Sequence, residues 1–313
     1  MSLSVQEQVL FALLFDEDLQ QRFSHDKKQA LQTFNLSESE QRDFYQIRVD
    51  ALTMDAQMRR QLLLSEFAKV LPLSFSLLSS FAEGSDLLTS RLTVDIMLLP
   101  QAQRALEFAR RIKLGLEESD WLETMQTRQQ KALLNITDLE IAMQETRAAL
   151  NHAILNERYT EPEYHFYEEE DEDWQIKPLA LAQYVAANVI NQPYMALKKQ
   201  LCPKGGSLLW RHLQDHPLPG FLCEEILSLD DSRLLISRAD VTHSSLQDPV
   251  IDHVTVELGG GFAPMFRHID GTMSVAQMLA HLRNAGANEI LCNSVKNGFY
   301  QLIQCGMLIL KNE

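Results

Sequence analysis

The stretch FRHIDGTMSVAQMLAHLRNAGANEILCNSVKNGFYQLIQCGMLIL (Phe266–Leu310) contains local signals that all agree on one arrangement of helices and turns. Asp270-Gly271 is a turn dipeptide, and Ser274 with Gln277 forms a capping box. A helix is therefore predicted to begin at Ser274. Apolar residues then recur at helical spacing, and Gly286 is expected to end the run.

A second helix and a strand are predicted to follow. Asn288 is a suitable N-cap, and Gly306 is expected to end this helix, whose apolar residues fall on one side. Met307–Leu310 is a short apolar run that suits a buried strand. Helix, tight turn, helix and strand in this order indicate a winged-helix module.

Strand signals also precede this module. Arg233–Arg238 and Asp252–Leu258 alternate between apolar and polar residues, which predicts an antiparallel hairpin joined by the polar loop Asp240–Pro249. In the second strand, Val254, Val256 and Leu258 are expected on one face, and His253, Thr255 and Glu257 on the other. The region from Pro178 to Lys199 is mixed, with a possible helix through LALAQYVAANVI.

The first 160 residues show repeated helix signals and few strand signals. They predict an all-α bundle whose neighbouring helices are antiparallel. The expected signals are a first helix running to about Phe23, a capping box at Ser37 and Glu40, a helix over Asp55–Val70 that stops near Pro72, a helix start at Pro100, and a last long helix capped by Thr137 and Glu140.

Together these patterns predict an α+β protein of two domains. Residues 1–160 form the helical domain, residues 161–176 an acidic linker, and residues 177–313 a winged-helix domain with a small antiparallel sheet. The linker carries eight acidic residues and neither Lys nor Arg, so a solvated segment is the simplest interpretation. Its carboxylates with His165 could instead bind a metal or a basic peptide.

The charge bears on the class of partner. The formal net charge is −15, which disfavours nucleic acid as a partner because phosphate binding needs a basic surface. Residues 177–313 carry 11 basic and 12 acidic residues, so this argument is weaker for the predicted winged helix.

Composition also bears on the compartment. No run approaches the ~20 apolar residues of a membrane span, and the N-terminus lacks the pattern of a signal peptide. The four cysteines are widely spaced without a C-x-x-C pair, which favours reduced thiols. We therefore expect a cytoplasmic protein that does not bind a membrane.

Few residues suggest catalysis or metal binding. His212 and His216 are four apart, as helical metal ligands can be, but Pro217 follows at once and no H-E-x-x-H motif is present. Cys223 has no nucleophile motif around it. The three glycines from Gly259 favour a backbone bend over a phosphate loop, because no nucleotide-binding motif surrounds them. We therefore expect neither a catalytic residue nor a metal ligand in this chain.

The C-terminal part resembles the PqqD-like recognition elements of ribosomal peptide modification pathways. That family reads L-x-D-G-T-x-[ST]-[VL], followed later by F-x-x-L-x-x-x-G-[LM]. The matching positions in this chain, over roughly residues 230–311, are Ile269, Asp270, Gly271, Thr272, Ser274, Val275, Phe299, Leu302, Gly306 and Met307.

The N-terminal half resembles the helical partner proteins of multinuclear non-heme iron-dependent oxidases. The similar segments are Arg59–Phe81, Leu106–Ile112 and Ser119–Leu134. Leu71 stands where the family has Phe before Pro72, and a glutamine, Gln129 or Gln130, stands where the family has an acid.

These resemblances imply a non-catalytic accessory protein that binds a ribosomal precursor peptide and presents it to the oxidase, as a heterodimer in which the oxidase holds the iron. The peptide would add a strand to Asp252–Leu258, beside a groove on the last helix. The expected peptide-binding residues are His253, Val254, Thr255, Val256, Glu257, Val295, Phe299 and Ile303. For Phe299, a core position is preferred. The alternatives are a stand-alone metal-dependent enzyme and a winged-helix transcription regulator.

Overall fold

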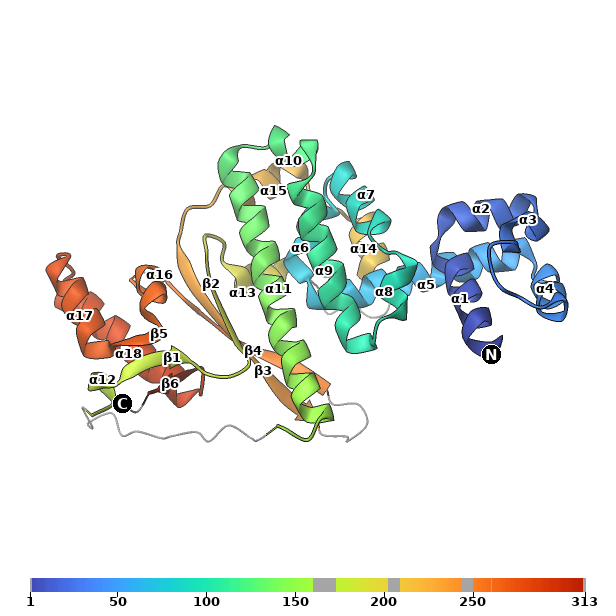
Figure 1. Cartoon of the computed structure of the whole chain (residues 1–313). Helices are drawn as coiled ribbons and strands as arrows, with labels where there is room; N and C mark the ends of the chain where they lie inside the picture. Colours follow the sequence, from blue (N-terminus) through green and yellow to red (C-terminus); the bar gives the residue numbers. More distant parts are fainter. Residues whose placement is uncertain (1, 160–172, 202–208, 244–249, 260, 312–313) are drawn as a thin grey trace. The chain divides into compact units, whose positions relative to one another are not determined.

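A computed structural model describes residues 2–159, 173–201, 209–243, 250–259 and 261–311. The protein is α+β: many helices accompany two three-stranded antiparallel sheets (Figure 1). The contacts divide the chain into two compact units. Unit 1 comprises Met1–Trp121 and Cys202–Gly220, and unit 2 comprises Leu122–Leu201 and Phe221–Glu313.

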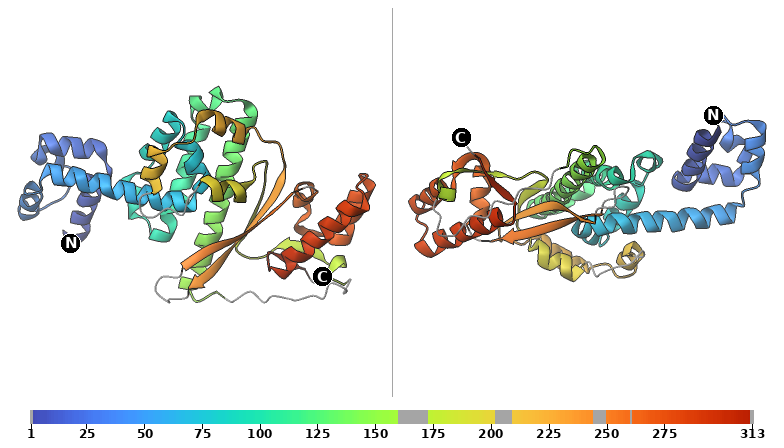
Figure 2. Two further views of the ribbon diagram at one scale, coloured as in Figure 1. Left: turned by 180° about the vertical axis from the view of Figure 1, so that it is seen from behind. Right: turned by 90° about the horizontal axis from the view of Figure 1, so that it is seen from below.

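Unit 1 is helical throughout its described residues. Its elements are α1 (Ser2–Phe15), α2 (Glu17–His25), α3 (Lys27–Leu31), α4 (Glu38–Tyr45), α5 (Val49–Val70), α6 (Pro72–Leu78), α7 (Ala82–Ser90), α8 (Val94–Leu98), α9 (Gln101–Glu117) and α14 (Leu209–Asp215), with α10 (Asp120–Thr124) at its boundary. The long helix α5, in light blue, extends from the group formed by α1–α4 to the other helices of this unit (Figure 2).

The core of unit 1 lies around α5, α6 and α9. Phe67 stacks on Phe108 with ring centroids 4.7 Å apart, and Phe75 meets the edge of Trp210 at 5.7 Å. The backbone N–H of Trp210 donates to Oγ of Ser65 over 3.0 Å. These contacts explain why α14, although distant in sequence, belongs to the helical unit.

Two expectations for the N-terminal helices have different outcomes. The capping box of Ser37 and Glu40 is confirmed at the start of α4. The expected single helix to Phe23 is wrong, because the first helix ends at Phe15 and a second begins after Asp16. There the carboxylate of Asp16 accepts the backbone N–H of Leu19 over 2.9 Å and begins α2.

Unit 2 contains both sheets. Its elements are α11 (Thr127–Leu155), α12 (Asp173–Ile176), β1 (Pro178–Leu181), β2 (Val185–Ile190), α13 (Tyr194–Leu201), α15 (Gly220–Leu227), β3 (Arg233–His243), β4 (Val250–Leu258), α16 (Phe262–Met265), the 3-10 turn η1 (Phe266–His268), β5 (Asp270–Ser274), α17 (Val275–Asn284), α18 (Glu289–Gln304) and β6 (Leu308–Leu310). One sheet has the order β5-β1-β6 and the other β2-β3-β4.

The predicted hairpin is confirmed as β3 and β4, which pair antiparallel from Leu234 opposite Leu258 onwards. Both strands are longer than expected, and β3 extends into the predicted polar loop, of which residues 244–249 lie outside the described part. Because alternate residues face opposite sides, Leu234 and Ile236 enter one core, while Ala239 packs with Leu150 of α11 on the other side. In Figure 1, α11 (green) crosses this sheet.

The expected start of the last long helix is wrong. The helix α11 begins at Thr127, ten residues before the expected cap. Thr137 lies inside the helix, where its hydroxyl donates to the carbonyl of Leu133 over 2.9 Å. Glu140 is buried and accepts the hydroxyl of Tyr194 over 3.0 Å. The T-x-x-E pattern, which can cap the start of a helix, therefore lies here in the interior of a helix.

The helix pair of the C-terminal stretch is confirmed. Ser274 and Gln277 form the capping box of α17, and Asn288 accepts the backbone N–H of Leu291 at the start of α18 over 2.8 Å. Gly286 follows α17 with φ +89°, a conformation that glycine adopts without strain. The last strand, β6, pairs with β1.

The expected helix over residues 179–190 is wrong. This segment forms β1 and β2, which belong to different sheets. Within β2, Val185, Ala187 and Val189 pack on the core beneath the sheet, a period of two that its alanines concealed.

The contact units differ from the expected domains. Since α11 packs on β2, β3 and β4, residues 122–160 group with the C-terminal part. Most of the expected acidic linker, residues 161–172, lies outside the described residues. Its end forms α12, where Trp174 is buried in the core of unit 2 beside Tyr300. This tryptophan fixes the end of the expected linker to the folded unit.

Among the described helices, none alone has the length and hydropathy to cross a membrane. The two helices α5 and α6 meet that composition only as a pair, and they are bent by 120° at the break between them.

Candidate functional site

The strand β4 lies at the edge of its sheet. The strand order is β2-β3-β4, so in the described part of the chain β4 pairs only with β3. An edge strand presents a row of unpaired N–H and C=O groups along its outer side. Val250, Asp252 and Val254 are exposed along this strand. The edge can therefore accept a further strand.

The side chains of His253, Thr255 and Glu257 all point to the helix-covered face of the sheet. Nε2 of His253 lies 2.8 Å from the carbonyl oxygen of Met143 in α11, and Thr255 shares a hydroxyl–hydroxyl bond of 3.0 Å with Ser237. These three residues were expected to bind peptide as part of the edge to which a strand is added. In the structure those side chains contact the chain itself, and only their backbone belongs to the exposed edge.

Glu257 illustrates this internal use most clearly. Its carboxylate accepts the backbone N–H of Met195 at the start of α13 over 2.9 Å, and it pairs with Arg233 over 2.8 Å. The side chain is only 10% exposed. Hydrogen bonds to Glu257 and then to Asp231 raise the pKa of the Arg233 guanidinium. Glu257 thus fixes α13 to the end of β4.

The opposite face of β4 is partly available. Val256 packs against the core of unit 2, whereas Val254 is 45% exposed. Val254 is therefore the expected residue of this face that a bound segment can contact directly.

A recess of about 850 Å³ lies between the end of β4 and the exposed side of α18. It is lined by Leu258, Gly261 and Phe262 and by residues of α18 from Ile290 to Gln301. Ile290 is 81% exposed. The recess therefore continues the open edge of β4 along a helix.

The three expected groove residues of α18 lie beneath this surface. Val295, Phe299 and Ile303 are buried in the core of unit 2. Phe262 packs against Phe299 with ring centroids 5.5 Å apart, and Gly298 leaves room for the Phe262 ring, because a Cβ there would lie 2.1 Å from it. The core position preferred for Phe299 is confirmed, whereas Val295 and Ile303 are buried and do not line the recess as expected. All three residues support its floor.

The residues that do line the recess from α18 include Asn293, Ser294, Asn297 and Gln301, all exposed. Sequence reasoning missed them because a polar side of an amphipathic helix is ordinarily a solvated face. The available signal was that this side carries three carboxamides, four residues apart, and no charged group among them.

Burial gives the site one titratable group with an unusual pKa. Desolvation lowers the pKa of His253 to about 4, with smaller contributions in the same direction from Arg147 and Lys198, whereas the hydrogen bond to Met143 and the charge of Asp252 act in the opposite direction. His253 is therefore neutral at pH 7, and its Nε2 donates to the Met143 carbonyl.

Of the other candidate residues that the structure describes, the two histidines of α14 and its C-terminal end are brought together. His212 and His216 are exposed and stack with ring centroids 4.8 Å apart. Among the described residues there is no group of three or more His, Cys, Asp or Glu side chains that could hold a metal ion. Cys223 and Cys292 are buried thiols, and Cys305 is exposed. His165 and Cys202 lie outside the described residues.

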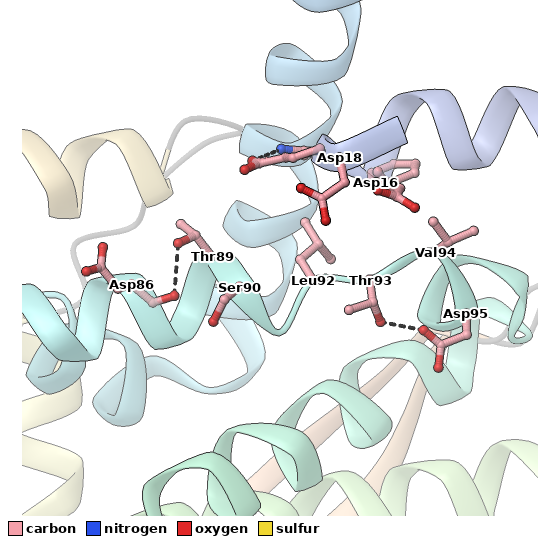
Figure 3. Close-up of a pocket in the computed structure, with 12 residues that line it drawn as sticks. Asp16, Asp18, Asp86, Thr89, Ser90, Leu92, Thr93, Val94 and Asp95 are labelled. Carbon is pink, nitrogen blue, oxygen red and sulfur yellow. Dashed lines mark hydrogen bonds and ion pairs between the residues drawn. The ribbon is translucent and has the colours of Figure 1, made fainter. Parts of the chain in front are cut away.

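A second recess, of about 660 Å³, lies in unit 1. Figure 3 shows Asp16 and Asp18 facing Thr89 and Leu92 across it. Asp95, at its far end, accepts hydrogen bonds from Arg111 and Thr93, which hold the pKa of its carboxyl well below the usual range. The lining is mainly acidic, and Arg60 is the basic residue among its described members.

Comparison with protein-family models, with curated proteins and with solved structures finds no match to this chain.

Proposed function

We propose that this chain is a non-catalytic partner protein that holds a ribosomally made precursor peptide and presents it to a multinuclear non-heme iron-dependent oxidase. The observation that carries the proposal is the open edge of β4 continued by the recess along α18. Strand addition at such an edge binds an extended peptide through main-chain hydrogen bonds, and a neighbouring recess receives side chains.

The order of elements supports a winged-helix, PqqD-like recognition element over roughly residues 230–311. The hairpin of β3 and β4 precedes α16, and α17, α18 and β6 follow. Asp270 begins β5, where its carboxylate accepts both the N–H and the hydroxyl of Thr272.

The chemistry of α18 favours a peptide over DNA. A helix that reads DNA needs basic side chains for the phosphates. The recess-lining side of α18, by contrast, carries Asn293, Asn297 and Gln301 between apolar residues. The net charge of −15 acts in the same direction.

The oxidase as partner rests on the resemblance of the helical half. In the structure the matching segments supply the core of unit 1: Phe67, Phe75 and Phe108 pack together. Gln129, at one of the two positions where the family has an acid, is buried and donates to the hydroxyl of Ser228 over 3.1 Å. These buried residues support a related helical fold.

Co-purification tests the proposal. The chain is co-expressed with a multinuclear non-heme iron-dependent oxidase and that oxidase's precursor peptide. We expect the three to elute together, with iron following the oxidase, and peptide binding to persist without the oxidase. Separate elution of the two proteins, or iron retained by this chain alone, would contradict the proposal.

A matched pair of proline substitutions tests the binding edge. Because N–H groups alternate in direction along a strand, Val254→Pro and Thr255→Pro remove donors on opposite sides of β4. The variant that retains the wild-type melting temperature has lost the outward donor, and it should lose peptide binding. Unchanged binding in that variant would exclude β4 as the site.

A further inference from the structure

One side of the long helix α5 in unit 1 has the residue spacing of a helix-packing surface. The residues of this side, called here the α5 seam, are Met54, Met58, Gln61 and Ser65. They follow one another at intervals of four, three and four, which places them on one side of an α-helix. The same intervals are those at which two helices pack lengthwise. The seam is therefore suited to contact with another helix.

In the structure α14 covers one end of the α5 seam. The backbone N–H of Trp210 donates to Oγ of Ser65 over 3.0 Å. Nε2 of Gln61 donates to Oε1 of Gln214 over 3.2 Å. Residue 210 thus lies at residue 65 and residue 214 at residue 61, so α14 runs antiparallel to α5. The helix α14 ends at Asp215, directly after its contact with Gln61.

The other end of the α5 seam is open and apolar. Met54 is 72% exposed and Met58 is 53% exposed. Leu52 and Ala56, on a different side of the same helix, are buried and attach α5 to its unit. Methionine side chains are flexible and polarisable, so they adapt to an apolar partner surface. The open end is thus a continuation of the surface that α14 already occupies.

The charges around the open end indicate the class of partner. Residues 48–63 contain three arginines and two aspartates, whereas the whole chain has a net charge of −15. Each of these arginines forms an ion pair, and Arg59 does so with Asp55 over 2.9 Å. The surface therefore attracts neither an anionic nor a cationic ligand. It also lacks the acidic surplus by which two copies of this chain repel each other.

We propose that the open end of the α5 seam binds the same surface of a second copy of the chain, with the two α5 helices antiparallel. A two-fold axis brings identical surfaces together, which requires a surface that is apolar and free of net charge. In a parallel arrangement, the C-terminal half of the second α5 would occupy the place of α14. The antiparallel arrangement avoids this overlap, and Met54 of each copy then packs against Met58 of the other. This dimer does not depend on the proposed function.

Sedimentation velocity of the chain alone tests the dimer. Two methionine layers are fewer contacts than a standard interface has, so we expect a dissociation constant of about 10–100 µM. Wild type should change from monomer to dimer between about 5 and 500 µM. Met58→Lys should remain monomeric over that range with an unchanged melting temperature. Leu98→Lys, at a 54% exposed position of α8, should dimerise like wild type. A wild type that is monomeric throughout, or a dimer that persists in Met58→Lys, would overturn the inference.

Charge complementation tests the antiparallel arrangement. Met54→Glu and Met58→Lys should each be monomeric, whereas an equal mixture of the two should dimerise, because the new carboxylate of one copy meets the new ammonium of the other. A mixture that stays monomeric would contradict this arrangement. If wild type is monomeric and Met58→Lys abolishes co-elution with the oxidase, the surface binds the oxidase. In that case the inference fails while the proposed function stands.

Discussion

Nε2 of His253 in β4 lies 2.8 Å from the carbonyl oxygen of Met143 in α11. The bond joins the strand proposed to bind peptide to the helix that crosses its sheet, and the imidazole that donates it is neutral at pH 7. Burial maintains that state by lowering the pKa of His253 to about 4.

The first prediction concerns pH. Between pH 6.5 and pH 4 the unfolded chain binds a proton at His253 that the folded chain excludes, so the stability present above pH 6.5 is lost progressively as the pH falls. The loss from this group should be about 2 kcal/mol at pH 5. Urea denaturation at pH 7 and pH 5 measures it. His253→Gln, which retains a donor for Met143, should show a loss smaller by that amount; an identical pH dependence in the variant would contradict the assignment.

Glu257→Gln tests the connection between β4 and α13. The variant loses the negative charge of the Glu257 carboxylate, which pairs with Arg233 and accepts the N–H of Met195. Because Glu257 is largely buried, we expect a loss of about 1–3 kcal/mol in the free energy of unfolding. The exposed Glu225→Gln in α15 serves as control and should change stability by less than about 0.5 kcal/mol. Equal effects of the two substitutions would refute the structural role of Glu257.

Gly298→Ala tests the close packing beneath the recess. A Cβ at this position would lie 2.1 Å from the ring of Phe262, so the ring must move. Overpacking of this kind costs about 1–3 kcal/mol, and the shifted ring would narrow the recess. Thermal unfolding should show a lower melting temperature. Gly220→Ala, which meets open space, should not lower it.

Tyr194→Phe tests the buried carboxylate of α11. The substitution removes the 3.0 Å hydrogen bond to Glu140 without removing the ring. Because Glu140 is fully buried, the loss should be about 1–3 kcal/mol by denaturant titration. Tyr45→Phe, whose hydroxyl bonds to Gln41 at a partly exposed position, should cost less. A greater cost at Tyr45 would show that burial does not govern these bonds.

In the C-terminal half, local signals correctly predicted the helix starts at which a side chain caps the neighbouring backbone. Ser274 and Asn288 cap helices through their own side chains, so their roles are visible in a few neighbouring letters. Thr137 and Glu140 have the same spacing as a cap, yet tertiary contacts place them within α11. Spacing alone cannot distinguish these cases, because the difference lies in a partner, Tyr194, more than fifty residues away.

The strand β4 was predictable from the sequence, and the recess beside it was not. Alternation in residues 252–258 predicted β4, but a period of two does not show which edge is paired or which face a helix covers. Apolar spacing pointed to Val295 and Phe299, which fill the core because helix amphipathicity marks the buried side. The recess belongs to the polar side, where Asn293 and Asn297 lie.

Hydrogen exchange of the β4 amides, with and without the precursor peptide, tests strand addition most directly. On binding, the amides that face away from β3 should become protected at alternate residues between Asp252 and Leu258, while those already bonded to β3 should change little. Peptide binding that leaves the outward amides of β4 exchanging at their original rate would contradict the proposed mode of recognition.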